Sequence, residues 1–183
     1  KSEYGRYLAN KMGKDVLFKR ASDLISMWVG ETEKLIAQAF KEAKDNKMVL
    51  IIDEGDSMLR DRTLSKNSWE VTQVNEMLSQ MEHHPEPFIL TTNLMSDIDP
   101  AALRRFSFKT EFKFVTKEQS HSLFRKFFGM DAGPELDRVD MLAPGDFYNV
   151  RKQIDIMGEA SAKAIIELLK AEVAVKPNAR NTI

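Results

Sequence analysis

The sequence predicts an α/β fold with a parallel sheet, followed by a small part that contains helices alone. Apolar runs of strand length alternate with helical patterns from residue 2 to about residue 115, as in strand–helix units that build a parallel sheet. After Val115 the pattern contains helices only. We therefore expect an α/β core over residues 1–115, a helical domain over residues 116–175 and a flexible tail over residues 176–183.

The composition is that of an ordinary globular protein, with 43% hydrophobic and 30% charged residues among 183. Lys and Arg (27) nearly balance Asp and Glu (28), so no overall field draws the chain to nucleic acid or to an anionic membrane. Cysteine is absent, which excludes disulfides and thiolate metal sites and fits a reducing compartment. No apolar run approaches the ~20 residues that span a bilayer, and we expect a cytoplasmic protein without a membrane partner.

The helices and strands of the α/β part follow from hydrophobic periodicity. Glu31–Asn46 carries one apolar stripe at helical spacing, which predicts an amphipathic helix. Met48–Ile52 is apolar throughout, which is typical of a strand buried on both faces of a parallel sheet. We also predict helices over residues 2–12, 21–25 and 68–81, and strands over residues 16–18, 87–92 and 108–112.

A capping pattern marks the change to helices alone. Thr116 and Gln119 match the capping box that opens a helix. The apolar face of that helix would consist of Leu123, Phe124, Phe127 and Phe128. Further helices are predicted over residues 134–141, 146–157 and 159–173.

Two acidic residues follow the most apolar strand of the chain. Residues 49–52 are apolar and lead directly into Asp53 and Glu54. In open α/β sheets, ligands bind at the carboxyl ends of the strands. There, a first carboxylate can hold Mg²⁺ directly or through water, and a second can polarise an attacking water. The same residues also fit a strand followed by an acidic helix start, where the helix dipole favours carboxylates.

The chain opens with Lys1-Ser2, the residue pair that ends a phosphate-binding P-loop. In a P-loop this pair leads into a helix whose N-terminus faces the phosphates. Here it opens a predicted helix upstream of the acidic strand, in the order that a P-loop nucleotidase requires, although the glycines of the loop are not in the chain. One face of the helix would carry Tyr4, Leu8 and Met12, and Gly13 would end it.

Motifs further along the chain resemble those of the AAA clade within the AAA+ ATPases. In order, they are MWVGE (27–31), DEGDS (53–57), VNEML (74–78), ILTTN (89–93) and IDPAALRRF (98–106). The resemblance covers residues 1–115. It implies a P-loop NTPase core that begins at the end of the Walker A loop and lacks its first strand, followed by a small all-helical lid. We therefore expect either that the chain continues upstream of Lys1 or that it cannot bind ATP in the ordinary way.

The resemblance implies a role for each residue of the nucleotide site, with ATP and Mg²⁺ bound there. Lys1 would contact the β- and γ-phosphates, and the Ser2 hydroxyl would ligate Mg²⁺. Asp53, in the Walker B motif, would support the metal, and Glu54 would be the general base for water. Asn93 resembles the sensor that orients this water, although asparagine is also a common turn residue.

The resemblance also implies three arginine roles. Arg104 and Arg105 resemble arginine fingers, which reach the nucleotide of a neighbouring subunit; a solvated basic turn is the alternative. The pattern does not choose between the two arginines. Arg151, in the helical part, could reach the γ-phosphate as a second sensor, and an exposed helical arginine explains it equally well.

A short aromatic loop resembles the pore loop of the same clade. Trp28 and Val29 are followed by Gly30, in a loop between two predicted helices. In the family, such loops line the centre of a ring and grip a polypeptide. The alternative is a tryptophan that folds back onto its own domain, as buried tryptophans do. Gly55 departs from the family pattern of an aliphatic residue or alanine, which could loosen the turn after the two acids.

The family resemblance predicts an ATPase that forms a hexameric ring and that remodels, unfolds or translocates a protein substrate. A nucleotide-dependent DNA or RNA assembly factor on the same fold, such as a clamp or helicase loader, is the second interpretation. Balanced charge and the aromatic loop make a nucleic-acid partner the weaker interpretation. A non-hydrolysing interaction module is the third, and the intact acidic pair argues against it.

Overall fold

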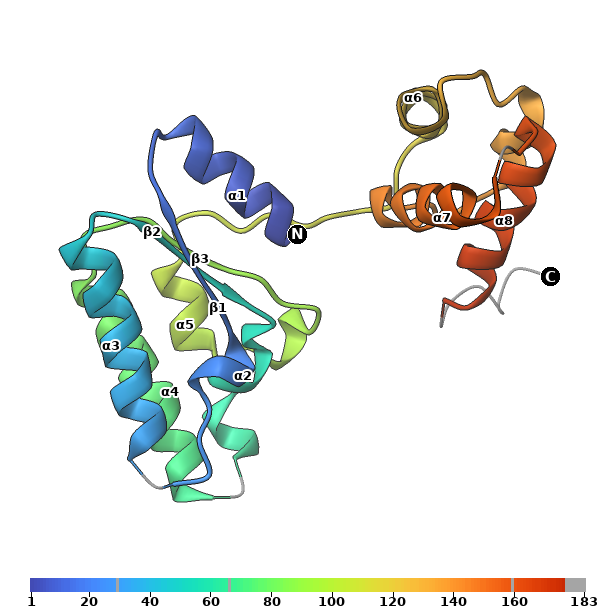
Figure 1. Cartoon of the computed structure of the whole chain (residues 1–183). Coiled ribbons are helices and arrows are strands. Elements are labelled where there is room, and N and C mark those ends of the chain that lie inside the picture. The colour runs from blue at the N-terminus through green and yellow to red at the C-terminus, as the bar shows by residue number, and fades with distance from the viewer. Residues whose placement is uncertain (29, 66, 159, 177–183) are drawn as a thin grey trace. The chain divides into compact units, whose positions relative to one another are not determined.

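The protein's structure is a computed structural model that describes residues 1–28, 30–65, 67–158 and 160–176 (Figure 1). The described residues fall into two units, which divide between Thr110 and Glu111. The first unit contains a sheet and helices, and the second contains helices alone. This arrangement confirms the predicted fold class. None of the described helices has the length and apolar character that a membrane crossing requires.

The sheet of the first unit has three parallel strands in the order β1-β2-β3. They are β1 (Val16–Arg20), β2 (Val49–Asp53) and β3 (Phe88–Leu90). The central strand β2 is fully buried over residues 49–52, as its unbroken apolar run predicts. Because the strands are parallel, the polar residues that follow β2 and β3 come to the same edge of the sheet.

Helices cover both faces of this sheet (Figure 1). One face packs on the apolar sides of two long helices, and the other packs on the first helix of the chain. The helices of the unit are α1 (Ser2–Lys11), α2 (Ala21–Leu24), α3 (Glu31–Asp45), α4 (Ser68–His83) and α5 (Pro100–Arg105). Three short 3₁₀ turns, Gly55–Met58, Arg62–Leu64 and Met95–Asp97, complete it.

Helix α1 buries a different face from the predicted one. Tyr4 and Met12, expected to face the core, are 43% and 47% exposed, whereas Gly5 and Ala9 are buried. The reason is close packing: a Cβ added at Gly5 would lie 3.1 Å from the Cδ1 atom of Ile51 in β2. The small residues therefore let α1 approach the sheet more closely than large apolar side chains would allow.

The prediction of a strand over residues 108–112 is wrong. The segment begins and ends with phenylalanine, but it has no regular structure and Phe108 is 90% exposed. A strand needs a neighbour that pairs with its backbone, and no described strand lies beside this segment. Two phenylalanines in a short segment therefore do not make it part of the sheet.

The second unit is a small helical domain with a phenylalanine-rich core of Phe124, Phe128 and Phe147. Thr116 forms the predicted capping box with Gln119, whose backbone N–H donates to the threonine hydroxyl at 3.3 Å. The helices are α6 (Lys117–Phe128), α7 (Pro144–Met157) and α8 (Ala162–Ala174), and a 3₁₀ turn (Pro134–Arg138) replaces the longer helix predicted over residues 134–141. Residues 177–183 of the predicted flexible tail lie outside the described residues.

The roles predicted for the two parts of the chain, a nucleotide-binding core and a lid, stay predictions.

Gly55 is buried directly behind the acidic pair, at the start of the turn that leaves β2. A Cβ at this position would lie 2.4 Å from the Cδ1 atom and 2.8 Å from the Cγ atom of Leu90 in β3. Carbon atoms do not approach so closely, so a side chain at this position would force the Leu90 side chain or the turn to move. Although Gly55 departs from the family pattern, the turn that begins at this residue packs closely on β3 and is not loosened.

We predict that Gly55→Ala lowers the free energy of unfolding by about 1–3 kcal/mol, because the new methyl group overpacks the contact with Leu90. Chemical denaturation measures the change. The loss should shrink in a Leu90→Ala background, where the methyl group has room. Gly145→Ala is the matched control, since a Cβ there meets no atom within 4 Å. Equal stability of Gly55→Ala and the parent would contradict the packing argument.

Candidate functional site

Residues from three distant segments meet at the carboxyl edge of the sheet. The Lys1 ammonium group donates to the carbonyl oxygen of Thr92 at 2.5 Å and to the side-chain oxygen of Asn93 at 2.6 Å. Beside it, the Ser2 hydroxyl donates to the Asp53 carboxylate at 2.6 Å. The structure therefore brings together four of the residues that the sequence predicts for one site: Lys1, Ser2, Asp53 and Asn93.

Asp53 is held as a carboxylate by its neighbours. It ends β2 and accepts hydrogen bonds from the hydroxyl groups of Ser2 and Thr91. Partial burial, the largest single effect, raises the pKa of the Asp53 carboxyl. The hydrogen bonds from Ser2 and Thr91, and then the positive charges of the Lys1 α-amino group and of Arg20, together outweigh burial, and the net pKa lies below the ordinary value of 3.8. The group is therefore ionised at neutral pH and available as an oxygen ligand for a cation.

Glu54 sits in an unusual backbone conformation beside this carboxylate. Its φ of 56° and ψ of 42° lie in the left-handed region, which costs a residue other than glycine about 1–3 kcal/mol. Its backbone N–H donates to the Thr91 hydroxyl at 3.3 Å, which helps to hold this conformation. The side chain is exposed and has no hydrogen bond or ion pair with any residue that the structure describes. Its carboxylate is thus free to act on a ligand.

Asp56 is a site residue whose role the sequence did not reveal. Its carboxylate accepts from the Thr92 hydroxyl, from the Asn93 backbone N–H at 3.2 Å and from the Leu94 backbone N–H at 3.4 Å. It therefore caps the loop that presents the Asn93 side chain. The only sequence signal is its position in the DEGDS motif, three residues after Asp53. The 3₁₀ turn that follows β2 carries Asp56 to the end of β3.

The donor groups of the site fit Mg²⁺ and phosphates. The Ser2 hydroxyl and the Asp53 carboxylate are hard oxygen ligands, and proteins usually hold Mg²⁺ through one or two such groups together with phosphates of the substrate. Among the described residues, no group of three or more His, Asp or Glu could hold a metal ion by itself. The N-terminus of α1 has no side-chain cap, so its backbone N–H groups are available to an anion.

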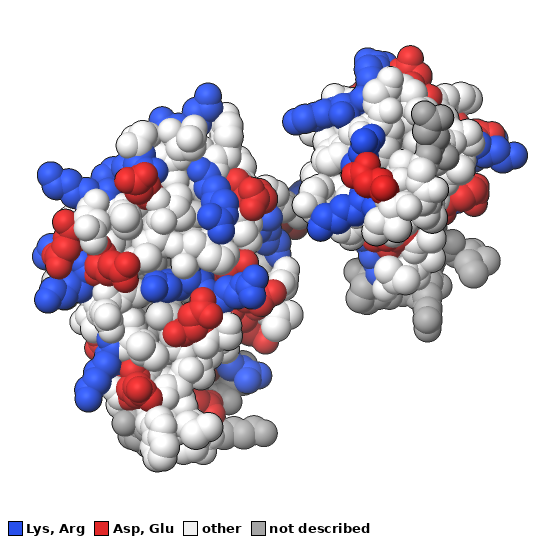
Figure 2. Space-filling model, viewed as in Figure 1, with Lys and Arg blue, Asp and Glu red and all other residues white. Residues whose placement is uncertain are grey.

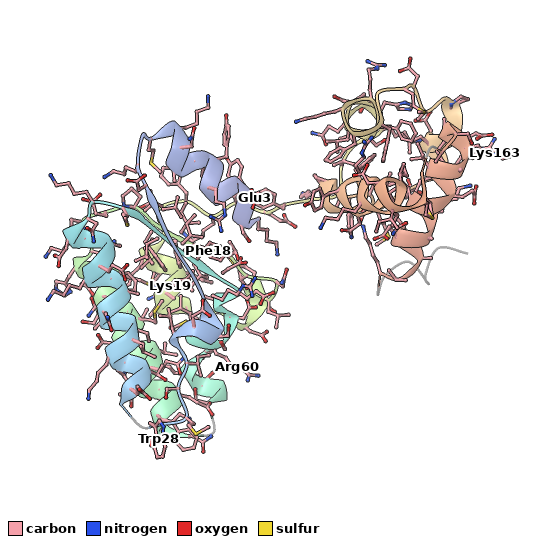
Figure 3. The ribbon with its side chains drawn as sticks, viewed as in Figure 1. Glu3, Phe18, Lys19, Trp28, Arg60 and Lys163 are labelled. Carbon is pink, nitrogen blue, oxygen red and sulfur yellow. The ribbon has the colours of Figure 1, made fainter. Side chains whose placement is uncertain are left out.

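The predicted pore-loop residues lie away from this cluster. Trp28 precedes α3 and is 71% exposed, so it is not buried in the core of its own unit. Figure 3 shows it at the end of the unit opposite Glu3. Gly30 adopts a left-handed φ of 80° and immediately precedes α3. Val29 lies outside the described residues.

The two neighbouring arginines of α5 have different surroundings. Arg105 forms an ion pair with Glu82 of α4 at 2.8 Å, and this contact lowers the pKa of the Glu82 carboxyl. Arg104 is exposed and has no hydrogen bond or ion pair within the described part of the chain. Arg151 belongs to the second unit, where it pairs with Asp155 at 3.0 Å, and its role at a nucleotide stays a prediction.

Comparison with known proteins identifies the family. Residues 1–114 match the model of the "ATPase family associated with various cellular activities (AAA)". The chain belongs to the AAA family. The matched residues include the whole cluster of Lys1, Ser2, Asp53 and Asn93, and the AAA family consists of ATP-binding ATPases.

Curated relatives agree with this assignment. The chain is 33% identical over 109 residues to the nuclear valosin-containing protein-like protein of Mus musculus, covering 57% of this chain and 13% of the relative. It is 26% identical over 173 residues to the vacuolar protein sorting-associated protein 4B of Mus musculus, covering 91% of this chain and 37% of the relative. The chain thus spans well under half the length of either relative.

The solved structure is that of the E. coli MS115-1 HORMA:CdnC:Trip13 complex. It matches with a TM-score of 0.71 at 20% identity, over 90% of this chain and 66% of that chain. At this identity, the likeness shows the fold alone.

We predict that Asp56→Ala releases the loop that carries Asn93. Loss of the carboxylate removes the acceptor of the Asn93 backbone N–H, so this amide hydrogen should exchange roughly 5- to 30-fold faster, whereas the Leu94 N–H keeps the Thr92 hydroxyl as an acceptor at 2.9 Å and should change less. Residue-resolved hydrogen exchange measures this. Asp97→Ala is the control, because the Asp97 carboxylate accepts from the Ser96 hydroxyl and not from these amides. Unchanged exchange at Asn93 would show that Asp56 does not hold the loop.

Proposed function

We propose that this AAA protein hydrolyses ATP with Mg²⁺ and, within a hexameric ring, uses the reaction to remodel, unfold or translocate a protein substrate. One observation carries the proposal: Lys1, Ser2, Asp53 and Asn93 converge at the edge of the sheet, with the exposed carboxylate of Glu54 next to them. These groups supply a cation, two oxygen ligands, a water-orienting amide and a base. An ATPase that uses bound Mg²⁺ requires this combination.

The proposed reaction divides the work among these side chains. The Lys1 ammonium and the N–H groups at the start of α1 bind phosphate oxygens, while Ser2 and Asp53 hold Mg²⁺, which would offset the phosphate charge. The Asn93 amide orients a water molecule. As that water attacks the γ-phosphorus and the bond to the ADP oxygen breaks, the Glu54 carboxylate accepts its proton.

In the proposed ring, Arg104 is the arginine finger that reaches the nucleotide of the neighbouring subunit. Arg105 already neutralises Glu82 of its own subunit, which leaves its guanidinium less free to reach outward. Arg104 is exposed and has no such partner in the described part of the chain. A finger supplied by the neighbour would make hydrolysis depend on assembly. The protein substrate would be gripped by the exposed Trp28.

A nucleic-acid assembly factor is the second candidate function, and the charge distribution supports it less. The chain has a net charge of −1. On the face drawn in Figure 2, basic and acidic side chains are interspersed rather than gathered in a basic stripe. Salt-sensitive binding to single-stranded DNA would favour this alternative. A cytoplasmic location stays a prediction.

We predict that Glu54→Gln binds ATP and fails to turn it over. The amide keeps the size and polarity of the side chain but cannot accept the proton of the attacking water, so kcat should fall about 10²–10⁴-fold. Single-turnover hydrolysis and filter binding measure the two steps separately. Glu167→Gln on α8 is the control and should hydrolyse ATP like the parent protein. Rapid turnover by Glu54→Gln would remove this residue from its proposed role.

We predict that Arg104→Ala lowers kcat by about 10³-fold or more and leaves the Kd for ATP unchanged, because the finger acts on the transition state. Arg105→Ala is the matched variant and should have a much smaller effect. Steady-state hydrolysis and nucleotide titration provide the readouts.

Mixed rings test whether the finger acts between subunits. A Glu54→Gln subunit still offers Arg104 to a neighbour, and an Arg104→Ala subunit still has Glu54. Mixing the two inactive variants should therefore restore part of the activity. An active Arg104→Ala protein, with the loss of activity found in Arg105→Ala instead, would reverse the assignment.

A further inference from the structure

A pocket of about 310 Å³ lies between the loop before α3 and the first turns of α4. Both tryptophans of the chain, Trp28 and Trp69, line it. Trp28 comes from the loop, whereas Trp69 is in the first turn of α4. The volume is at the lower end of the roughly 300–1,000 Å³ of ligand pockets, which suits one or two side chains of a polypeptide better than a large cofactor.

The largest side chains that line this tryptophan pocket are apolar and exposed to water, and polar side chains such as Ser26 and Gln73 line the rest. Trp28 is 71% exposed, Trp69 is 53% exposed and Met27, which also lines the pocket, is 89% exposed. Large apolar groups gathered at a surface pocket mark an interaction site, and tryptophan is the residue most enriched among those that dominate binding energy. Helix α4 packs along α3, so Trp69 stands on a rigid element beside the loop that carries Trp28.

The charge of the pocket limits what can occupy it. Glu33, in the first turn of α3, is the one charged residue among those that line the pocket in the described part of the chain. No described Lys or Arg lines it. The faces of the two tryptophans also attract cations. A ligand that combines an apolar side chain with a positive charge therefore matches both the tryptophan side chains and Glu33.

We propose that Trp69, together with Trp28 and Glu33, forms a specificity pocket for the substrate polypeptide, which it selects by a large apolar side chain next to a Lys or Arg. The apolar side chain of the substrate contacts the tryptophan side chains that line the pocket, and its basic side chain pairs with Glu33. This inference rests on the proposed function, because it assigns a substrate class to an enzyme that acts on proteins. It adds a residue, Trp69, and a charge preference that the sequence motifs did not indicate.

The test measures binding of short fluorescein-labelled peptides to the full-length protein by fluorescence anisotropy. The peptides differ only at a central pair of residues: Leu-Arg, Leu-Glu, Leu-Ser or Ser-Arg. The Leu-Arg peptide should bind most tightly. Trp69→Ala should weaken its binding about tenfold or more. Glu33→Lys should reverse the preference between the Leu-Arg and Leu-Glu peptides.

Two further variants separate this inference from the proposed function. Phe108→Ala removes an aromatic side chain that is 90% exposed elsewhere on the same unit, and it should bind all peptides like the parent. Trp28→Ala tests the loop before α3, which is proposed to grip the substrate. If Trp28→Ala weakens binding and Trp69→Ala does not, the specificity pocket is refuted while the proposed function stands. If neither variant affects binding, or if no peptide binds, polypeptide recognition at this end of the unit is refuted altogether.

Discussion

The hydrogen bond from the Ser2 hydroxyl to the Asp53 carboxylate joins residues 51 positions apart and holds the first helix against the end of the central strand. A hydrogen bond to an ionised group stabilises a fold by about 1.5–3 kcal/mol. With α1 held there, the Lys1 ammonium reaches Thr92 and Asn93 at the end of β3. The cation and the carboxylate that a bound magnesium nucleotide needs are therefore brought together by the packing of α1 on the sheet.

Three consecutive residues after Asp53 make the rest of this site possible, and each does so for a different physical reason. Glu54 takes a left-handed conformation that leaves its carboxylate exposed. Gly55 lets the turn pack on Leu90, where a side chain would collide. Asp56 then accepts the hydrogen bonds that hold the loop of Asn93. The turn thus combines the reactive group with the packing and capping that keep the neighbouring loop in place.

The same turn lies under the segment that leads to the tryptophan pocket. Helix α2 packs against β1 and against the Gly55–Met58 turn, and the chain then runs through Ile25 to Trp28. The backbone that carries the exposed tryptophan therefore rests on the residues that follow Glu54. Trp69 approaches the same pocket from α4, which also packs on that turn. The nucleotide site and the tryptophan pocket are in this way built on shared elements of one α/β unit.

The sequence by itself determined the alternation of strands and helices and the polar ends of β2 and β3, because periodicity and strand-end polarity are local properties of the chain. From these, and from the family motifs, Lys1, Ser2, Asp53 and Asn93 could be assigned to one site. The tertiary structure alone decided which face α1 buries, that residues 108–112 form no strand, that Asp56 caps the Asn93 loop and that Trp69 stands beside Trp28. Each of these depends on contacts between residues far apart in the chain, and hydrophobic periodicity carries no information about such partners.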